Sequence, residues 1–278
     1  MFDVTHPEVR DAVARALAED IGPGDLTSAL TVPEDRRAVG AFYAREPMVL
    51  AGVELLPLIY GLRGGGVEVD LRAASGTAVA AGTPVAEVQG PARRLLECER
   101  VALNFLQRLS AVATLASQYV EAVRGTRARI LDTRKTTPGL RRLEKMAAAA
   151  GGATNHRIGL FDAVLIKNNH IAAAGGVRAA LDAARESIVP VEIEVRTLDE
   201  LHEALACGAQ RLLLDNLTPG QAREWVAIVG RRASTEISGG VTLETVRDYA
   251  ESGADFISVG AITHSARALD LNFRLQWH

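Results

Sequence analysis

An alternation of apolar strands with amphipathic helices, running from about Arg129 to Ala261, is the feature that most constrains the fold. Short β-branched runs are separated by patterns of helical periodicity such as "LDELHEALACGA". This alternation predicts a parallel sheet with crossover helices, either as a doubly wound open sheet or as a (β/α) barrel. The six predicted strands favour a barrel that falls short of eight. They are "RILDTRK", "AVLIKNN", "VEIEVR", "RLLLDN", "STEISGG" and "FISVGAI".

The residues before about Leu106 follow a different pattern. Runs such as "VEVDLRAAS" and "GTPVAEVQG" lie between glycines and prolines, which indicates short strands joined by turns. A long 3.6-residue periodicity then begins at "PARRLLECERVALNFLQ" and indicates one or two helices. We place a domain boundary within it and predict an N-terminal domain over residues 1–106 and a catalytic barrel over residues 107–266. No helix follows the closing "LDLNFRLQWH", so residues 267–278 are expected to pack back on the first domain.

The composition excludes several classes of protein. The 278 residues carry a net charge of −3, so an anion site must be a local cluster, and nucleic acid is not an expected partner. Cys98 and Cys207 form no metal or redox motif, which suits a reducing compartment. The N-terminus shows no apolar signal segment, and no run approaches the roughly 18 apolar residues of a membrane span. We expect a cytoplasmic protein without membrane contact.

Cationic side chains gather at the carboxyl ends of two predicted strands and in the connection between them. All three lysines of the chain fall within this region, although Lys and Arg together number 31. Lys145 lies mid-helix and is expected to form an ion pair or to face solvent. The other cations should converge on one edge of the sheet, where they suit a ligand with two or more carboxylates or phosphates. These converging residues are Arg134, Lys135, His156, Arg157 and Lys167.

Two carboxylates close strands that should be buried. Glu194 ends "VEIEV" and Asp215 ends "LLLD". An ionised carboxylate in such a place needs a partner, so one interpretation is a structural salt bridge. The other is the binding of sugar hydroxyls, or of Mg²⁺ either directly or through water. Glu192 precedes Glu194 by two residues and falls on the same face of the strand, where it shares this role or lies one layer deeper.

Glycine turns follow the last two predicted strands, as "SGG" over residues 238–240 and "VGA" over residues 259–261. Successive turns of this kind at the end of a barrel are typical of a phosphate cradle built from backbone N–H groups. No HExxH, CxxC, GxGxxG or GxxxxGK[ST] motif is present, and no nucleophile is set beside a base. The residues therefore predict a barrel enzyme that binds a sugar phosphate beside a multiply anionic co-substrate.

Longer motifs carry a family resemblance over nearly the whole chain. "EDIGPGDLTS", "ERVALNFLQRLSAVAT", "DTRKTTPGLR", "NHRIGLFDAVLIKNNH" and the closing "SGG…VGA" resemble quinolinate phosphoribosyltransferase in the same order. The resemblance implies an N-terminal α/β sandwich domain packed on an incomplete (β/α) barrel. It also implies a homodimer in which each N-terminal domain helps to close the partner's active site.

The resemblance further implies a reaction between quinolinate and phosphoribosyl pyrophosphate that depends on Mg²⁺ and ends in decarboxylation. Catalysis would rest on Lys135, Glu194 and Asp215, and the two carboxylates would hold the Mg²⁺. Arg100 would reach the partner subunit's site. The implied quinolinate ligands are Arg100, Arg134, His156, Arg157 and Lys167. The implied ligands of phosphoribosyl pyrophosphate are Thr133, Lys135, Glu194, Asp215, Ser238, Gly239, Gly240, Val259, Gly260 and Ala261.

Two other functions compete with this one. A related phosphoribosyltransferase, either for nicotinate or of the type encoded with molybdate-transport systems, would share the "TRKTTPG" pattern. Nicotinate has one carboxylate and quinolinate has two, so five candidate cations favour the diacid. A non-catalytic module that binds phosphoribosyl compounds would leave Glu194 and Asp215 without a role.

Overall fold

The computed structural model describes residues 2–276. It contains two compact units, which we call the sandwich unit (residues 1–117, 136–152 and 262–278) and the barrel unit (residues 118–135 and 153–261). The predicted boundary near Leu106 falls inside one long helix, α4 (Ala92–Ala122), whose residues contribute to both units.

The sandwich unit is built on a four-stranded antiparallel sheet in the order β12-β1-β5-β3. The last strand of the chain pairs along β1, and the Phe42 and Phe273 rings pack across the pair in a tilted arrangement with centroids 4.7 Å apart. These strands are β1 (Arg37–Ala44), β3 (Glu68–Leu71), β5 (Pro84–Pro91) and β12 (Leu271–Gln276), with a separate pair of β2 (Met48–Val49) and β4 (Ala78–Val79). The helices are α1 (Pro7–Ile21), α2 (Leu26–Thr31), α3 (Leu55–Leu62), α5 (Arg141–Ala150) and part of α4.

Local sequence signals explain where these helices begin and end. Pro7 starts α1, where a missing N–H costs nothing, and the His6 ring accepts the N–H of Glu8. Gly22 ends α1 with a positive φ of 51°. In the barrel unit, Thr197 caps α8 through a reciprocal pair of hydrogen bonds with Glu200.

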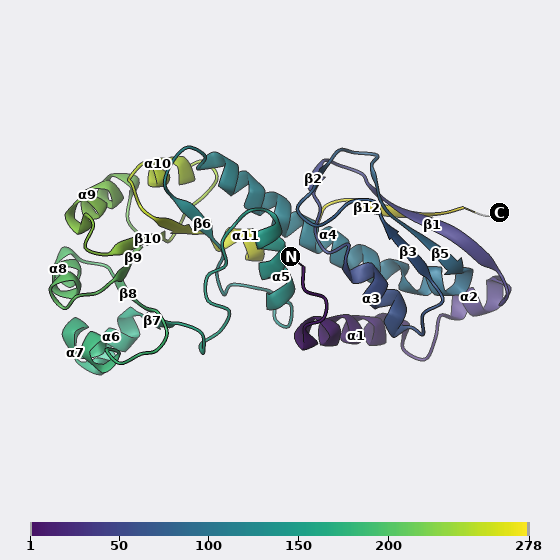
Figure 1. Cartoon of the computed structure of the whole chain (residues 1–278), viewed down its shortest axis with the longest axis horizontal. Helices are drawn as coiled ribbons and strands as arrows, with labels where there is room; N and C mark the ends of the chain where they lie inside the picture. The colour runs from purple at the N-terminus through teal and green to yellow at the C-terminus, as the bar shows by residue number, and fades with distance from the viewer. Residues whose placement is uncertain (1, 277–278) are drawn as a thin grey trace. The chain divides into compact units, whose positions relative to one another are not determined.

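The barrel unit is a six-stranded parallel sheet in the order β6-β11-β10-β9-β8-β7, which confirms the predicted α/β class with an incomplete barrel. Figure 1 shows the helices α6 to α10 along the outer side of this curved sheet. The strands are β6 (Arg129–Leu131), β7 (Val164–Ile166), β8 (Val191–Val195), β9 (Arg211–Asp215), β10 (Ser234–Ser238) and β11 (Phe256–Ser258). The helices are α6 (Asn168–Ala174), α7 (Val177–Ala183), α8 (Leu198–Ala206), α9 (Pro219–Val229), α10 (Val246–Ala250) and the start of α11 (Ala261–His264).

The two faces of the barrel sheet differ in chemistry because side chains alternate along each strand. One face carries Ile193, Leu212, Leu214, Ile237 and Ile257, all fully buried. Burial of each such side chain contributes about 1.5–3 kcal/mol, so this face holds the helices on the sheet. The register places the opposite residues side by side on the other face, which carries Glu192, Glu194, Leu213, Asp215, Glu236 and Ser238.

Within residues 2–276, no helix combines the length and the apolar character that crossing a bilayer requires.

Candidate active site

The functional side chains of the barrel unit lie where its parallel strands end. Residues 133–135 follow β6, Lys167 follows β7 as the N-cap of α6, and Asp215 and Ser238 close β9 and β10. Thr154 bridges to Leu131 beside β6, so the segment that carries His156 and Arg157 starts at the same sheet. Arg100, by contrast, is an exposed residue of α4 in the sandwich unit.

Asp132 anchors the segment after Thr154. Its carboxylate is fully buried and accepts the side-chain amide of Asn155 at 2.6 Å and the backbone N–H of His156 at 2.8 Å. Charge-assisted bonds of this length hold the chain firmly. Asp132 therefore fixes the start of the cationic segment 155–157.

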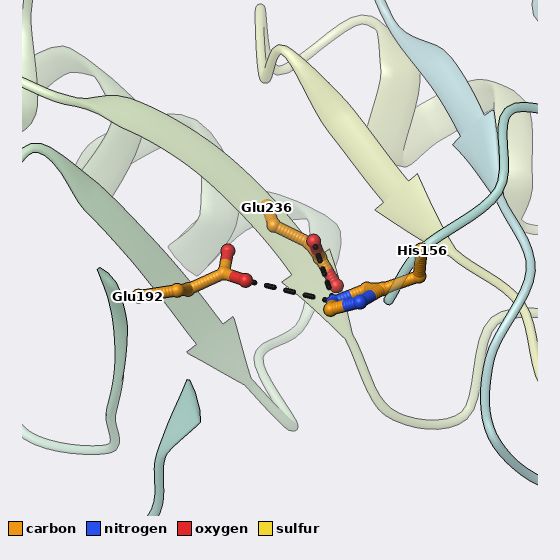
Figure 2. A group of neighbouring side chains, drawn as sticks. All are labelled: His156, Glu192 and Glu236. Atoms are coloured by element: carbon orange, nitrogen blue, oxygen red, sulfur yellow. Dashed lines mark ion pairs between the residues drawn. The ribbon is translucent and has the colours of Figure 1, made fainter. Parts of the chain in front are cut away.

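The His156 side chain lies between two buried carboxylates that come from different strands (Figure 2). Its Nε2 lies 3.5 Å from Oε2 of Glu192 on β8 and 3.5 Å from Oε2 of Glu236 on β10. The exposed fractions of these side chains are 13% for His156, 6% for Glu192 and 1% for Glu236. The three groups form a compact buried cluster on the polar face of the sheet.

Burial and charge act in opposite directions on this cluster. Burial alone lowers the pKa of His156, but Glu192 and Glu236 outweigh it and raise that pKa to about 9. Burial also raises the pKa of Glu236, and contact with His156 offsets this only in part. The backbone N–H of Arg157 donates to Nδ1 of His156 at 2.7 Å, which opposes a second proton on the ring. The two influences oppose each other at Nδ1, because the carboxylates favour the doubly protonated ring and the Arg157 N–H requires a lone pair there, but both are compatible with a proton on Nε2.

Arg157 continues the cationic segment. Its Nη1 donates to the carbonyl of Ala163 at 3.0 Å, and the carboxylate of Asp162 accepts the N–H groups of Ile158 and Gly159. Burial, followed by the nearby charge of Arg134, lowers the pKa of Arg157. A cavity of about 540 Å³ opens here toward the amino ends of the strands, because its lining joins His156 and Arg157 to the first residues of β6, β7, β9 and β11. This is the size of a site for a small organic ligand.

Glu194 and Asp215 meet through an arginine that the sequence patterns did not single out. Nη2 of Arg196 lies 2.8 Å from Oε1 of Glu194 and 3.1 Å from Oδ2 of Asp215. The two carboxylates are 6% and 11% exposed, while Arg196 is 45% exposed. They form a pair that is close enough to bind one cation between them.

The first predicted phosphate turn is tightly built. Gly239 has φ +98°, and a Cβ atom there would lie 2.2 Å from Oδ1 of Asn216. Asn216 itself has a left-handed φ of 57° and donates its N–H to the carbonyl of Ser238 at 2.8 Å. Only glycine fits a backbone that combines positive φ with such a close approach. The turn after β10 is thereby joined to the residue that follows Asp215.

The second predicted phosphate turn differs, because Val259 is 1% exposed and donates its N–H to the carbonyl of Leu131 at 2.9 Å. That N–H takes part in the hydrogen bonding of the sheet. Gly260 and Ala261 are the residues of this turn that lie beyond the paired strands. Lys135 and Lys167 are both exposed. Thr133 accepts the N–H of Lys135 through its hydroxyl at 3.1 Å.

The structure excludes one of the two positions expected for Lys145. It is 1% exposed on α5, which rules out a position facing solvent. Sequence patterns also missed Asp132, Arg196 and Glu236. The signal for Glu236 was present, since it stands two residues before Ser238 and must share its face of the strand. Nothing in the sequence indicated that it would meet His156.

The fold and site define a class of enzyme in which an incomplete parallel α/β barrel gathers cations and carboxylates at the ends of its strands for an anionic substrate. Residues 25–110 match the family model of the quinolinate phosphoribosyl transferase N-terminal domain, and residues 112–274 match that of the C-terminal domain. The chain therefore belongs to the quinolinate phosphoribosyltransferase family.

Relatives and solved structures agree with this assignment. The chain is 43% identical to the carboxylating nicotinate-nucleotide pyrophosphorylase of Mycobacterium leprae, over 99% of this chain and 100% of that protein. A probable enzyme of the same name from Bacillus subtilis is 38% identical, over 97% and 94%. The solved structure of NadC from Streptococcus pyogenes has a TM-score of 0.95 and 36% identity, and covers 100% of both chains. The nicotinate-nucleotide pyrophosphorylase of Francisella tularensis has a TM-score of 0.92 and 38% identity, over 96% and 97%.

Proposed function

We propose that this protein transfers the phosphoribosyl group of phosphoribosyl pyrophosphate to quinolinate and decarboxylates the product to nicotinate mononucleotide, a step of NAD biosynthesis. The observation that carries this proposal is that one face of one sheet carries both the Glu194–Asp215 carboxylates and the two glutamates, Glu192 and Glu236, that contact His156 of the cationic segment. The names of the full-length relatives support the same reaction.

The chemistry needs positioning and charge more than a nucleophilic side chain. The lone pair of the pyridine nitrogen forms a bond to the anomeric carbon, and the carbon–oxygen bond to pyrophosphate breaks with its electrons on the leaving group. Glu194 and Asp215 would favour the positive charge that develops on the sugar. The ring then becomes a pyridinium, so the adjacent carboxylate leaves as CO₂, its bonding pair stays on C2, and C2 takes up a proton.

Recognition of the diacid is proposed for the cations. Arg134, His156, Arg157 and Lys167 would bind the two carboxylates from one subunit, with Lys135 on phosphoribosyl pyrophosphate. Backbone N–H groups of the turn at 238–240 and of Gly260 and Ala261 would bind the 5′-phosphate. We also propose a homodimer in which Arg100 contributes to the partner's site. A cytoplasmic location agrees with two cysteines that are both free thiols.

Mg²⁺ is proposed as the cofactor, held by Glu194 and Asp215. The donor set fits a hard cation, because both groups are carboxylates and both lie within 3.1 Å of one positively charged group, Nη2 of Arg196. When bound, Mg²⁺ would neutralise charge on the diphosphate. Arg196 now lies against both carboxylates, so Arg196→Gln should strengthen Mg²⁺ binding, whereas Asp215→Asn should weaken it. Isothermal titration with MgCl₂ alone measures both, and equal affinities in all three proteins would contradict this site.

The proposed reaction is tested by a product assay on purified protein with Mg²⁺ and phosphoribosyl pyrophosphate. Quinolinate and nicotinate are offered separately. Nicotinate mononucleotide and CO₂ from quinolinate, with little product from nicotinate, is the expected result. Product from nicotinate alone would move the assignment to the neighbouring transferase. Binding of phosphoribosyl pyrophosphate without turnover of either acid would show a binding module.

A further inference from the structure

Glu236 is a buried charged residue to which the proposed reaction assigns no task. It is 1% exposed, and neither of its carboxylate oxygens has a hydrogen bond among residues 2–276. Its ion-pair partner is the Nε2 of His156 at 3.5 Å, which it shares with Glu192 (Figure 2), and the Ser258 side chain beside it also lowers the pKa of Glu236. Oε1 of Glu192 is likewise buried without a hydrogen bond in the part of the chain that the structure describes. Burying polar atoms without hydrogen bonds costs free energy. The arrangement therefore calls for a functional explanation.

The negative charges of Glu192 and Glu236 do not help the protein to bind an anionic substrate. Two buried carboxylates beside a site for a dianion repel that ligand, and they do so strongly because little water screens them. A neutral or apolar side chain at position 236 would remove this repulsion of the diacid. A direct contribution of Glu236 to substrate binding is therefore excluded by its sign, which leaves a structural effect on a neighbour.

A metal ion is one occupant that the cluster could hold. Three ligand atoms, one each from His156, Glu192 and Glu236, lie within 4.8 Å of one another. However, a metal on Nε2 requires the ring proton on Nδ1, usually donated to an acceptor. Here Nδ1 faces the N–H donor of Arg157 at 2.7 Å, which needs a lone pair at that atom. The contact assigns the proton to Nε2, which faces the two carboxylates at 3.5 Å.

We propose that Glu236, together with Glu192, is a positioning residue that holds the Nε2–H side of His156, so that Nδ1 fixes the backbone of Arg157 and sets the place of its guanidinium for the diacid. The chain of contacts is continuous: Asp132 holds the N–H of His156, the two glutamates orient its ring, and the ring receives the N–H of Arg157. This inference rests on the proposed function, because it assigns Arg157 to quinolinate.

The kinetic test compares Glu236→Leu and Glu236→Gln with the wild type. Glu236→Leu removes the acceptor, and we expect the KM for quinolinate to rise at least about tenfold, as for other displaced binding groups, while the KM for phosphoribosyl pyrophosphate stays unchanged. Glu236→Gln keeps an acceptor oxygen and should recover much of the loss. An unchanged or lower KM for quinolinate in Glu236→Leu would overturn the proposal, since a purely repulsive charge predicts that result.

The matched control is Thr235→Val. Thr235 is buried on the same strand but points to the helix-covered face, where its hydroxyl contacts Asp255. This variant should lose thermal stability without a change in the KM for quinolinate. If Thr235→Val raised that KM as much as Glu236→Leu does, the effect would be general to the strand and the positioning role would be wrong.

A second measurement does not depend on turnover. In protein labelled with ¹⁵N-histidine, the His156 signals are assigned by their loss in His156→Asn, and long-range proton–nitrogen spectra report which nitrogen carries the proton. We expect a protonated Nε2 at pH 7 that equimolar Zn²⁺ leaves unchanged. A bare Nε2, or one that binds Zn²⁺, would replace the positioning role with a metal site. If the wild type did not use quinolinate at all, the proposed function would fail while this spectrum still tested the cluster.

Discussion

Glu144 on α5 is fully buried, and its Oε1 lies 2.7 Å from Nη2 of Arg108 on α4. The same carboxylate accepts the backbone N–H of Thr137 at 3.0 Å and its hydroxyl at 2.7 Å. Arg108 also donates to the carbonyls of Thr263 and Ala266. One buried ion pair in the sandwich unit therefore connects α4 to α5, to the "TTPG" loop and to residues 263–266. The role of this pair is structural.

Glu144→Gln should lower the free energy of unfolding by about 3–5 kcal/mol, because it leaves the Arg108 charge without a counter-charge in a largely buried place. Chemical denaturation monitored by circular dichroism measures the loss. The control is Glu8→Gln, which breaks an ion pair with Arg142 in which Glu8 is 60% exposed. That change should cost less than about 1 kcal/mol. An equal loss of unfolding free energy in the two variants would show that the buried pair contributes no more than the exposed one.

Lys167→Arg should impair the use of quinolinate although it conserves charge. An ammonium is a compact point charge, and a guanidinium is a longer planar fork that does not fit the same contact. We expect a higher KM for quinolinate in steady-state assays. Arg185→Lys, on a side chain that is 74% exposed, is the charge-conserving control and should behave as the wild type does. Wild-type kinetics in Lys167→Arg would remove Lys167 from the site.

Gly239→Ala should damage the protein more than Gly240→Ala does. Both glycines have positive φ, so each substitution strains the backbone by about 1 kcal/mol. A Cβ at Gly239 would also lie 2.9 Å from the backbone nitrogen of Asn216, whereas the space around Gly240 is open. The added clash should appear as a lower melting temperature in scanning calorimetry. It should also weaken the binding of phosphoribosyl pyrophosphate, and similar melting temperatures for the two variants would argue against the clash.

His156 should make the stability of the protein depend on pH. Glu192 and Glu236, acting against burial, raise the pKa of His156 to about 9, above the value of about 6.5 for an unperturbed histidine. A group whose pKa is raised on folding stabilises the native state fully below its unfolded pKa, and this stabilisation is lost as the pH rises through the folded pKa. The melting temperature should thus fall between about pH 6.5 and 9, and the fall should be shallower in His156→Asn. Parallel curves for the two proteins would show that the ring does not titrate in this range.

Local patterns were sufficient to predict the parallel sheet. Alternating side chains and amphipathic helices repeat over a few residues, so each strand of the barrel unit could be located from its own segment. The same reasoning placed Glu194 and Asp215 at strand ends and glycines in the following turns, because strand direction determines which end is open to a ligand. The resemblance in "DTRKTTPGLR" and "NHRIGLFDAVLIKNNH" then identified the family, which the comparisons confirm.

Only the tertiary structure decided which of these residues meet. The contact of His156 with Glu236 joins residues that are far apart in the chain, and it depends on the register between strands. Arg196 reaches Asp215 for the same reason. The burial of Lys145 and the pairing of Arg108 with Glu144 follow from how helices pack, which helical periodicity alone does not determine. Sequence determined the elements and the edge on which chemistry gathers, because those depend on neighbours along the chain. The partners of each charge depend on neighbours in space.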